Sequence, residues 1–122
     1  MTASTPAALL DPEAIKRLRE LDPSGSNKLL ERVVAAFSSS LDRLLPELDR
    51  AREGDALDLT IVRHVSHTLK SSSASLGAMV LSARCADIET QAREGRREGL
   101  PEQLDAMLND IQQVRAALAA LL

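Results

Sequence analysis

The 122-residue sequence has almost no aromatic side chains: Phe37 is its single aromatic residue, and tryptophan and tyrosine are absent. Proteins that bind single-stranded nucleic acid usually stack the bases on aromatic side chains, so the composition argues against this function. The strands of β-sandwiches and barrels favour aromatic and β-branched residues, so these folds are disfavoured as well. A core made of Leu, Ile, Val, Ala and Met instead favours packed helices.

The sequence also lacks an excess of positive charge, because 15 basic and 18 acidic residues give a formal net charge of −3. Binding to the phosphate backbone of nucleic acid is therefore not expected. The single cysteine, Cys85, allows neither an internal disulfide nor a cysteine-based zinc site, which suits a reducing compartment. No run approaches the roughly 20 apolar residues of a membrane span. Since residues 1–10 show no signal-peptide pattern either, we expect a cytoplasmic protein without membrane association.

Helical periodicity runs through most of the sequence, because apolar residues recur at spacings of three and four. Residues 1–10, which are small and polar at first, are expected to form a flexible lead at a natural chain start. A single domain follows over 11–122, and its pattern predicts helices over about 11–21, 27–53, 56–76, 79–94 and 101–121. The short polar connections favour an all-α fold, an antiparallel up-down four-helix bundle with an additional short N-terminal helix.

Several residues predict where these helices begin, bend and end. Asp11 followed by Pro12 is typical of a helix start, and Asp55 is expected to cap the third helix. Pro46 lies within an uninterrupted apolar register, which predicts a kink in the preceding turn in preference to a break. Gly77 suits the left-handed conformation that commonly ends a helix.

The third predicted helix carries the most informative residues. With about 100° of rotation per residue, a buried face centred on Val65 places His67 on the opposite, exposed side. Lys70 and Arg63 are expected to be exposed one turn from it, where they would stabilise an anion held on the imidazole. Residues 71–75 include four serines, which are poor helix formers and therefore favour a site selected for access. The small or polar residues that leave the imidazole accessible are His64, Ser71, Ala74, Ser75 and Ala78.

The segment HTLKSSSASLGA, residues 67–78, resembles the signature of histidine phosphotransfer (HPt) domains, His-x-Leu-Lys-Gly-Ser-x-x-x-Leu-Gly-Ala. The resemblance covers residues 55–95 and continues through Leu81, Cys85, Ile88-Glu89 and Ala92-Arg93-x-Gly95. One departure is Ser71, where the family usually has a glycine that lets the loop of a receiver domain approach closely. This departure puts partner affinity and partner choice in question.

The resemblance implies a phosphoryl carrier in a bacterial-type, multistep two-component phosphorelay. His67 would carry the phosphoryl group between aspartates of receiver domains, and Lys70 would pair with its oxygens, with Arg63 as a second candidate. The small and polar neighbours named above, His64, Ser71, Ala74, Ser75 and Ala78, would form the docking surface.

The resemblance also implies the partners: response-regulator receiver domains and a hybrid sensor histidine kinase. The receiver would supply Mg²⁺ and most of the catalytic groups. The chain would need no cofactor, no metal and no general-base carboxylate beside His67, and it would have no kinase activity of its own. A monomer is expected, since one reactive histidine per chain suffices.

Other interpretations of the same residues remain open. A helical adaptor that binds a receiver or kinase without carrying phosphate predicts unchanged behaviour after His67→Gln. A kinase or phosphatase is disfavoured because the sequence has no nucleotide-binding glycines and shows no paired histidine and carboxylate. His64 and His67 could share a metal ion, but the adjacent Lys70 and Arg63 disfavour a cation. Cys85 is interpreted as a small buried hydrophobe.

Overall fold

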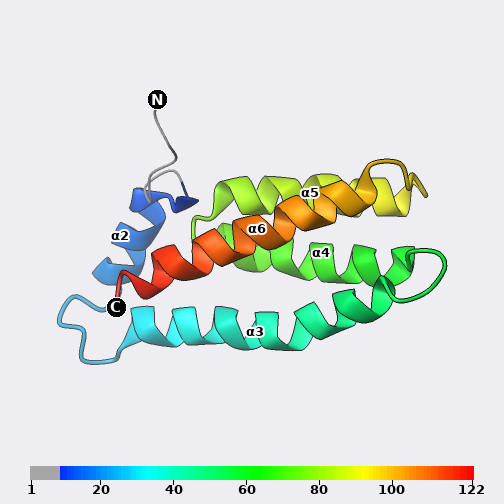
Figure 1. Ribbon diagram of the computed structural model, residues 1–122. Helices are drawn as coiled ribbons and strands as arrows, with labels where there is room; N and C mark the ends of the chain where they lie inside the picture. Colours follow the sequence, from blue (N-terminus) through cyan, green and yellow to red (C-terminus); the bar gives the residue numbers. More distant parts are fainter. Residues whose placement is uncertain (1–8) are drawn as a thin grey trace.

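A computed structural model describes residues 9–122. These residues form the helices α2 (Pro12–Glu20), α3 (Leu29–Ala51), α4 (Leu59–Ser75), α5 (Met79–Arg93) and α6 (Leu100–Ala119), and no strands. Figure 1 shows α3 to α6 as an antiparallel bundle, with α2 at the end where the C-terminus also lies. The predicted all-α fold, a four-helix bundle with an additional short helix before it, is confirmed.

The four long helices share one aliphatic core, to which Phe37 contributes the single aromatic side chain. Burying a leucine or isoleucine side chain contributes about 1.5–3 kcal/mol, so such a core can hold a bundle together without aromatic residues. Leu21 lies outside this core and is 73% exposed, because α2 ends before it. The largest fully buried side chains are Leu41, Leu44, Leu48, Leu69, Leu76, Leu81, Ile88, Leu100, Leu104, Met107, Ile111 and Leu118.

The long helix α3 continues through Pro46 without a break. Its apolar stripe stays buried on both sides of the proline, from Val34 to Leu48. In Figure 1 the last turns of α3 bend towards α4, in keeping with the predicted kink. The proline therefore redirects the end of the helix without interrupting its contact with the core.

The helix α4 begins later than the sequence predicted. Asp58, not Asp55, is its N-cap, and the Asp58 carboxylate accepts hydrogen bonds from the backbone N–H groups of Thr60 (3.1 Å) and Ile61 (3.3 Å). The predicted start at residue 56 is therefore wrong. Both aspartates are favourable N-caps, and the structure uses the one that comes directly before the buried apolar face of the helix.

The turn between α4 and α5 anchors the start of α2. Gly77 has φ +76° there, as the predicted left-handed cap requires, and its carbonyl accepts a hydrogen bond from the Asp11 N–H at 2.7 Å. The Asp11 side chain in turn caps α2 by accepting from the Glu13 N–H at 3.0 Å. A Cβ atom on Gly77 would lie 2.7 Å from the Ala14 Cβ. Leu10 is also buried, so the predicted lead over 1–10 extends too far, and its first eight residues lie outside the described range.

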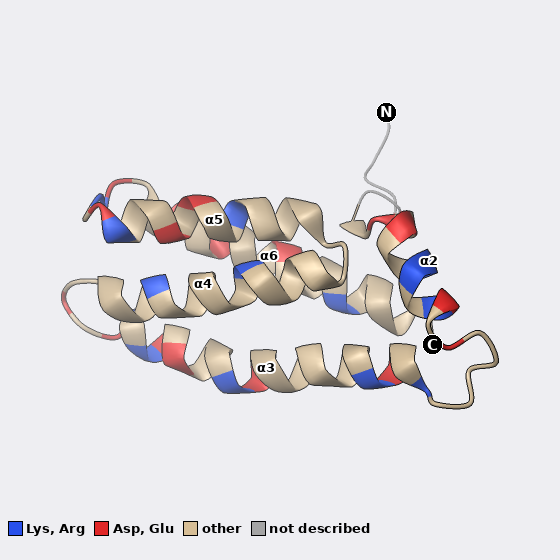
Figure 2. Cartoon of the chain, turned by 180° about the vertical axis from the view of Figure 1, so that it is seen from behind, with Lys and Arg blue, Asp and Glu red and all other residues tan. Residues whose placement is uncertain are grey.

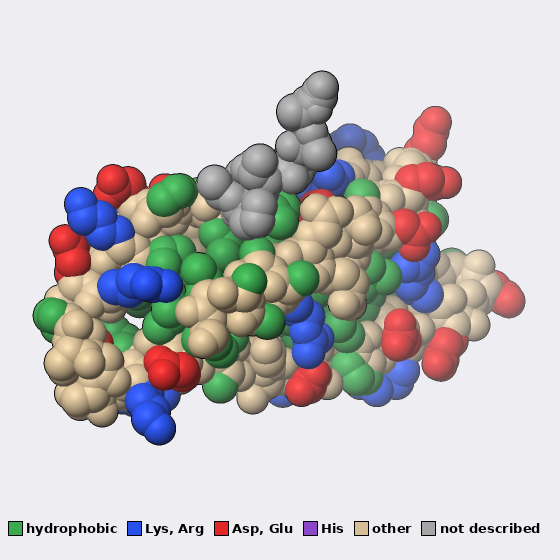
Figure 3. All heavy atoms as spheres, turned by 60° about the vertical axis from the view of Figure 1, so that its left-hand side comes forward, with side chains coloured by type: hydrophobic (Ala, Val, Ile, Leu, Met, Phe, Trp, Pro, Cys, Tyr) green, Lys and Arg blue, Asp and Glu red, His purple; other side chains and the backbone are tan. Residues whose placement is uncertain are grey.

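An apolar groove of about 630 Å³ lies between α2 and the last turns of α6. Figure 3 looks towards this end of the molecule, where hydrophobic side chains are visible between charged ones. None of the site residues described below lines the groove. It is lined by Leu10, Pro12, Ile15, Lys16, Arg19, Glu20, Pro23, Ala117, Ala120 and Leu121. Within residues 9–122, no helix is long and apolar enough to cross a lipid bilayer.

Candidate functional site

His67 projects from the middle of α4 into solvent, with 62% of its side chain exposed. The two charged side chains of this helix are both basic, Arg63 and Lys70, and Figure 2 shows how few charges α4 carries compared with α3. The helical phase predicted from the sequence therefore places His67 correctly. The buried face of α4 consists of Val62, Val65, Ser66, Leu69 and Ser73.

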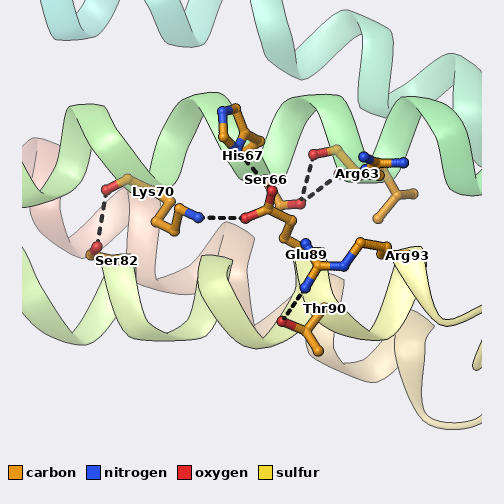
Figure 4. A network of polar contacts seen from close by, with 9 residues as sticks. Arg63, Ser66, His67, Lys70, Ser82, Glu89, Thr90 and Arg93 are labelled. Carbon is orange, nitrogen blue, oxygen red and sulfur yellow. Dashed lines mark hydrogen bonds and ion pairs between the residues drawn. The ribbon is translucent and has the colours of Figure 1, made fainter.

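Glu89 reaches from α5 towards α4 and contacts both His67 and Lys70 (Figure 4). Its Oε2 atom lies 2.7 Å from Nδ1 of His67, and its Oε1 atom lies 2.6 Å from Nζ of Lys70. Only 9% of the Glu89 side chain is exposed, and Lys70 is 35% exposed. The expectation that Lys70 is exposed is therefore wrong, because Lys70 is half-buried and paired, and the sequence did not predict the carboxylate beside His67.

The electrostatics of this cluster fix which nitrogen of His67 carries the hydrogen. The hydrogen bond from Lys70 lowers the pKa of Glu89, and the contact with His67 adds to this effect, while burial opposes it. Glu89 is therefore an ionised carboxylate at neutral pH, which accepts hydrogen bonds and cannot donate them. Because of this, Nδ1 of His67 must be the donor. In the neutral ring the lone pair then resides on Nε2, the nitrogen farther from Glu89.

The ionisation of Glu89 is expected to stabilise the fold at neutral pH and to lose this effect in acid. Since the pKa of Glu89 is lowered in the folded state, the contribution is fully present above the ordinary value of 4.5 and disappears as the pH falls through the folded value. Denaturant unfolding of the wild type and Glu89→Gln should show a difference in stability that shrinks between about pH 7 and about pH 3. Asp87→Asn, which removes an exposed charge from α5, is the control. A difference that stays constant with pH would contradict this prediction.

Buried serine side chains lie on α4 and α5 behind the site, and one of them links the two helices. Ser66 Oγ donates to the carbonyl of Val62 at 2.7 Å, and Ser82 Oγ of α5 donates across to the carbonyl of Lys70 at 2.9 Å. Ser73 is fully buried, and its Oγ has no hydrogen-bond partner among the described residues. Because these side chains are small, α5 lies close enough for its own side chains to reach the outer face of α4.

The exposure of the serines shows how α4 is oriented in the bundle. Ser72 is partly exposed, whereas Ser66 and Ser73 are buried, because α4 packs most extensively against α5. The Ser72 hydroxyl donates to the carbonyl of Thr68 at 3.1 Å, one turn back along the helix. The buried face is therefore turned towards α5, the helix that carries Glu89.

Of the residues predicted to surround His67, Ala78 does not belong to the exposed surface. It is fully buried in the core. The helix ends at Ser75, and the left-handed Gly77 breaks the helical phase that would have carried Ala78 outward. The prediction that Ala78 helps to dock a partner is therefore wrong. The exposed residues of the predicted set are His64, Ser71, Ala74 and Ser75.

A hollow of about 330 Å³ lies beside the imidazole and is lined by Thr60, Arg63, His64, His67 and Glu89. Arg63 forms no ion pair within residues 9–122, so its guanidinium is available to an anion that enters this hollow. Within the same residues, no three His, Cys, Asp or Glu side chains come together as a metal site requires. An anion that enters the hollow would therefore meet the positive charge of Arg63 beside the imidazole.

Glu89 is the site residue that the sequence reasoning missed. It lies seven residues after Ser82, so both occupy the same side of α5, where Ser82 also contacts α4. The sequence feature that could have indicated Glu89 is a carboxylate placed directly after the buried Ile88. Arg93, one turn further along α5, folds back so that its guanidinium lies 3.4 Å from the Thr90 hydroxyl (Figure 4).

Comparison with known proteins places the chain in a family. The model of the Hpt domain family matches residues 32–117. Histidine-containing phosphotransfer protein 1 of Oryza sativa subsp. japonica is 29% identical over 114 residues, which cover 93% of this chain and 77% of the relative. Phosphorelay protein LuxU of Vibrio vulnificus is 35% identical over 81 residues, which cover 66% of this chain and 69% of the relative.

Solved structures agree with the sequence comparison. A histidine-containing phosphotransfer protein from maize has a TM-score of 0.81 at 26% identity, covering 95% of this chain and 84% of its own. Histidine-containing phosphotransfer protein B from Pseudomonas aeruginosa has a TM-score of 0.70 at 25% identity and covers 92% of each chain. The chain belongs to the Hpt domain family. Its function is histidine phosphotransfer in a phosphorelay.

Proposed function

We propose that His67 is the residue that accepts a phosphoryl group from the aspartate of one receiver domain and passes it to the aspartate of another. The observation that carries this proposal is the contact between Glu89 and Nδ1, which leaves the lone pair on Nε2 of an exposed ring. In the accepting step, this lone pair forms the N–P bond. The P–O bond to the receiver breaks, and its electron pair goes to the aspartate carboxylate.

Two cations near the ring would stabilise the transferred group. Arg63 lines the hollow beside His67, and Lys70 lies one turn further along α4, where it pairs with Glu89. Phosphoryl transfer depends mainly on positioning and charge neutralisation, and both cations would supply charge. Mg²⁺ would be held by the receiver domain, so the chain acts as a carrier that relies on its partner for catalysis.

The partners would be receiver domains of response regulators and a hybrid sensor histidine kinase in the cytoplasm. Receiver domains would dock over the exposed surface formed by His64, Ser71, Ala74 and Ser75. Ser71 brings a hydroxymethyl group to the place where related domains usually have glycine, so it would affect which receivers bind closely. The chain would act as a monomer, because the site described above lies within one chain.

The proposal is tested by incubating the purified chain with a radiolabelled, phosphorylated receiver domain and Mg²⁺. Label should move to the chain in a form that is labile in acid and stable in alkali, as an N–P bond requires. Incubation with labelled ATP alone should leave the chain unlabelled. Binding of the receiver without transfer of label would favour the helical adaptor instead, and labelling by ATP alone would identify a kinase.

Lys70→Ala is expected to slow transfer of the phosphoryl group by about tenfold or more, because a cation near the transferred oxygens is lost. Stability should fall by about 1–3 kcal/mol, since Lys70 itself is partly exposed but its loss leaves the buried Glu89 carboxylate without its ion-pair partner. Transfer rates from a labelled receiver and thermal unfolding give the two measurements. Lys16→Ala, which removes an exposed lysine from α2, is the matched control. Unchanged transfer in Lys70→Ala would remove Lys70 from the site.

A further inference from the structure

We infer that Glu89 keeps the proton on Nδ1 of His67 while Nε2 carries the phosphoryl group, and thereby keeps that group transferable to the next receiver. The inference rests on the proposed function and concerns the step in which the chain gives the phosphoryl group away. Glu89 is a positioning residue in this step, since it touches the imidazole on the side opposite the reacting nitrogen.

The bonds and charges explain why the proton matters. When Nε2 forms its bond to phosphorus, Nδ1 keeps its hydrogen and the ring becomes a cation. In the donating step, an aspartate oxygen of the second receiver forms the new P–O bond. The N–P bond breaks, and its electron pair returns to Nε2 to give a neutral ring. No proton enters or leaves in either direction. If Nδ1 lost its proton in between, donation would have to expel an imidazolate anion, which is a far poorer leaving group.

The geometry places a negative charge where it retains this proton. Oε2 of Glu89 lies 2.7 Å from Nδ1, and the carboxylate is almost fully shielded from solvent. An opposite charge in contact with a ring nitrogen favours the form of the ring that carries the positive charge. The imidazolium formed during transfer is therefore stabilised by an ion pair that already exists as a hydrogen bond in the free protein.

Lys70 holds the carboxylate in place for this role. Its Nζ atom donates a hydrogen bond to Oε1 of Glu89 at 2.6 Å, and Oε2 of the same carboxylate is directed at the imidazole (Figure 4). The same contact lowers the pKa of Glu89, so the carboxylate remains negative over the range in which phosphoryl transfer takes place. Lys70 therefore supports Glu89 in addition to its proposed contact with the phosphoryl oxygens.

The other charged and titratable groups around the ring come from the two helices that form the site. Arg63, His64 and Lys70 lie on α4, and Arg93 lies on α5 beyond Glu89. The hollow beside the ring is lined by residues of α4 and α5, and α3, which packs on the other side of α4, carries the half-buried Glu47. Of the residues that line the hollow, Glu89 is the acidic one, and its carboxylate is in contact with Nδ1, where it can retain the proton.

The experiment compares the wild type with Glu89→Gln, which keeps a hydrogen-bond acceptor of the same shape and removes the charge. Each protein is phosphorylated by a labelled receiver domain and separated from it. Donation to fresh receiver and spontaneous hydrolysis are then followed from about pH 6 to about pH 9. Both rates should fall as the pH rises, and in Glu89→Gln this fall should begin about one pH unit or more below the pH at which it begins in the wild type. Donation by Glu89→Gln near pH 8 should therefore be about tenfold slower than donation by the wild type. Asp87→Asn should behave as the wild type.

A second measurement does not depend on how well the variant folds. Nitrogen-15 NMR of the phosphorylated wild type near pH 8 should show a hydrogen on Nδ1 of His67. A ring without that hydrogen, or pH profiles that coincide in the wild type and Glu89→Gln, would overturn the inference and leave the proposed function intact. Absence of label from the wild type would instead overturn the proposed function.

Discussion

Replacing His67 by glutamine is expected to abolish acceptance of the phosphoryl group while the bundle remains folded. The glutamine amide is polar and similar in reach, but its nitrogen has no lone pair that can attack phosphorus. Because 62% of the His67 side chain is exposed, the change removes little packing, and the stability should move by less than about 1 kcal/mol. The measurements are transfer of label from a phosphorylated receiver domain and thermal unfolding followed by circular dichroism.

The matched comparison is His64→Gln, which changes the second exposed histidine of α4; because His64 belongs to the proposed docking surface, this variant should at most accept label more slowly, without losing acceptance. Receiver binding by His67→Gln, measured by calorimetry, should persist because the surrounding surface is retained. Label on the His67→Gln variant would show that another residue carries the phosphoryl group. Loss of label in both variants would point to the surface of α4 in general instead of His67.

Gly77→Ala is expected to destabilise the protein by about 2–5 kcal/mol, for two reasons that act together. An alanine would have to keep φ near +76°, and its Cβ would lie 2.7 Å from the Ala14 Cβ and 3.0 Å from the Asp11 backbone nitrogen. The start of α2 would then have to move off the turn between α4 and α5, and the hydrogen bond from Asp11 to the Gly77 carbonyl would be strained or lost. Denaturant unfolding followed by circular dichroism measures this loss.

Gly95→Ala separates the strain of a positive φ from the steric clash of the added Cβ atom. Gly95 has nearly the same backbone angle, φ +73°, but a Cβ there would meet nothing within 4 Å. Its replacement should therefore cost only the conformational strain, about 1–2 kcal/mol. If Gly77→Ala were no more destabilising than Gly95→Ala, close contact between α2 and the turn would not contribute to stability.

The helices themselves could be predicted from the sequence because their signals are local. Apolar spacing places α3 and α6, and proline and glycine mark several of their ends. The start of α4 could not be placed as well, since Asp55 and Asp58 are equally suitable caps. The choice between them depends on which turn lets the apolar face of the helix meet the core.

The site was predictable only where it lies on one helix. The phase of α4 determines that His67 is exposed, and this follows from neighbouring residues alone. Glu89 belongs to another helix, 22 residues further along, and its position depends on how α5 rotates against α4. Ala78 shows the same limit, because its burial depends on a change of direction at Gly77 that helical phase does not contain.

The serines between α4 and α5 control the site without touching the reacting atoms. A glutamate side chain has a limited length, so the hydrogen bond between Glu89 and His67 exists only while the two helix axes stay near their present separation. Ser73, one of the buried serines of α4, has a hydroxyl that makes no hydrogen bond among the described residues. A bulkier side chain at this position would move α5 outward and separate carboxylate from imidazole, although both remain in the sequence. The chemistry of the exposed histidine therefore depends on the size of buried side chains that do not contact it. A substitution at one of these buried positions would change phosphoryl transfer.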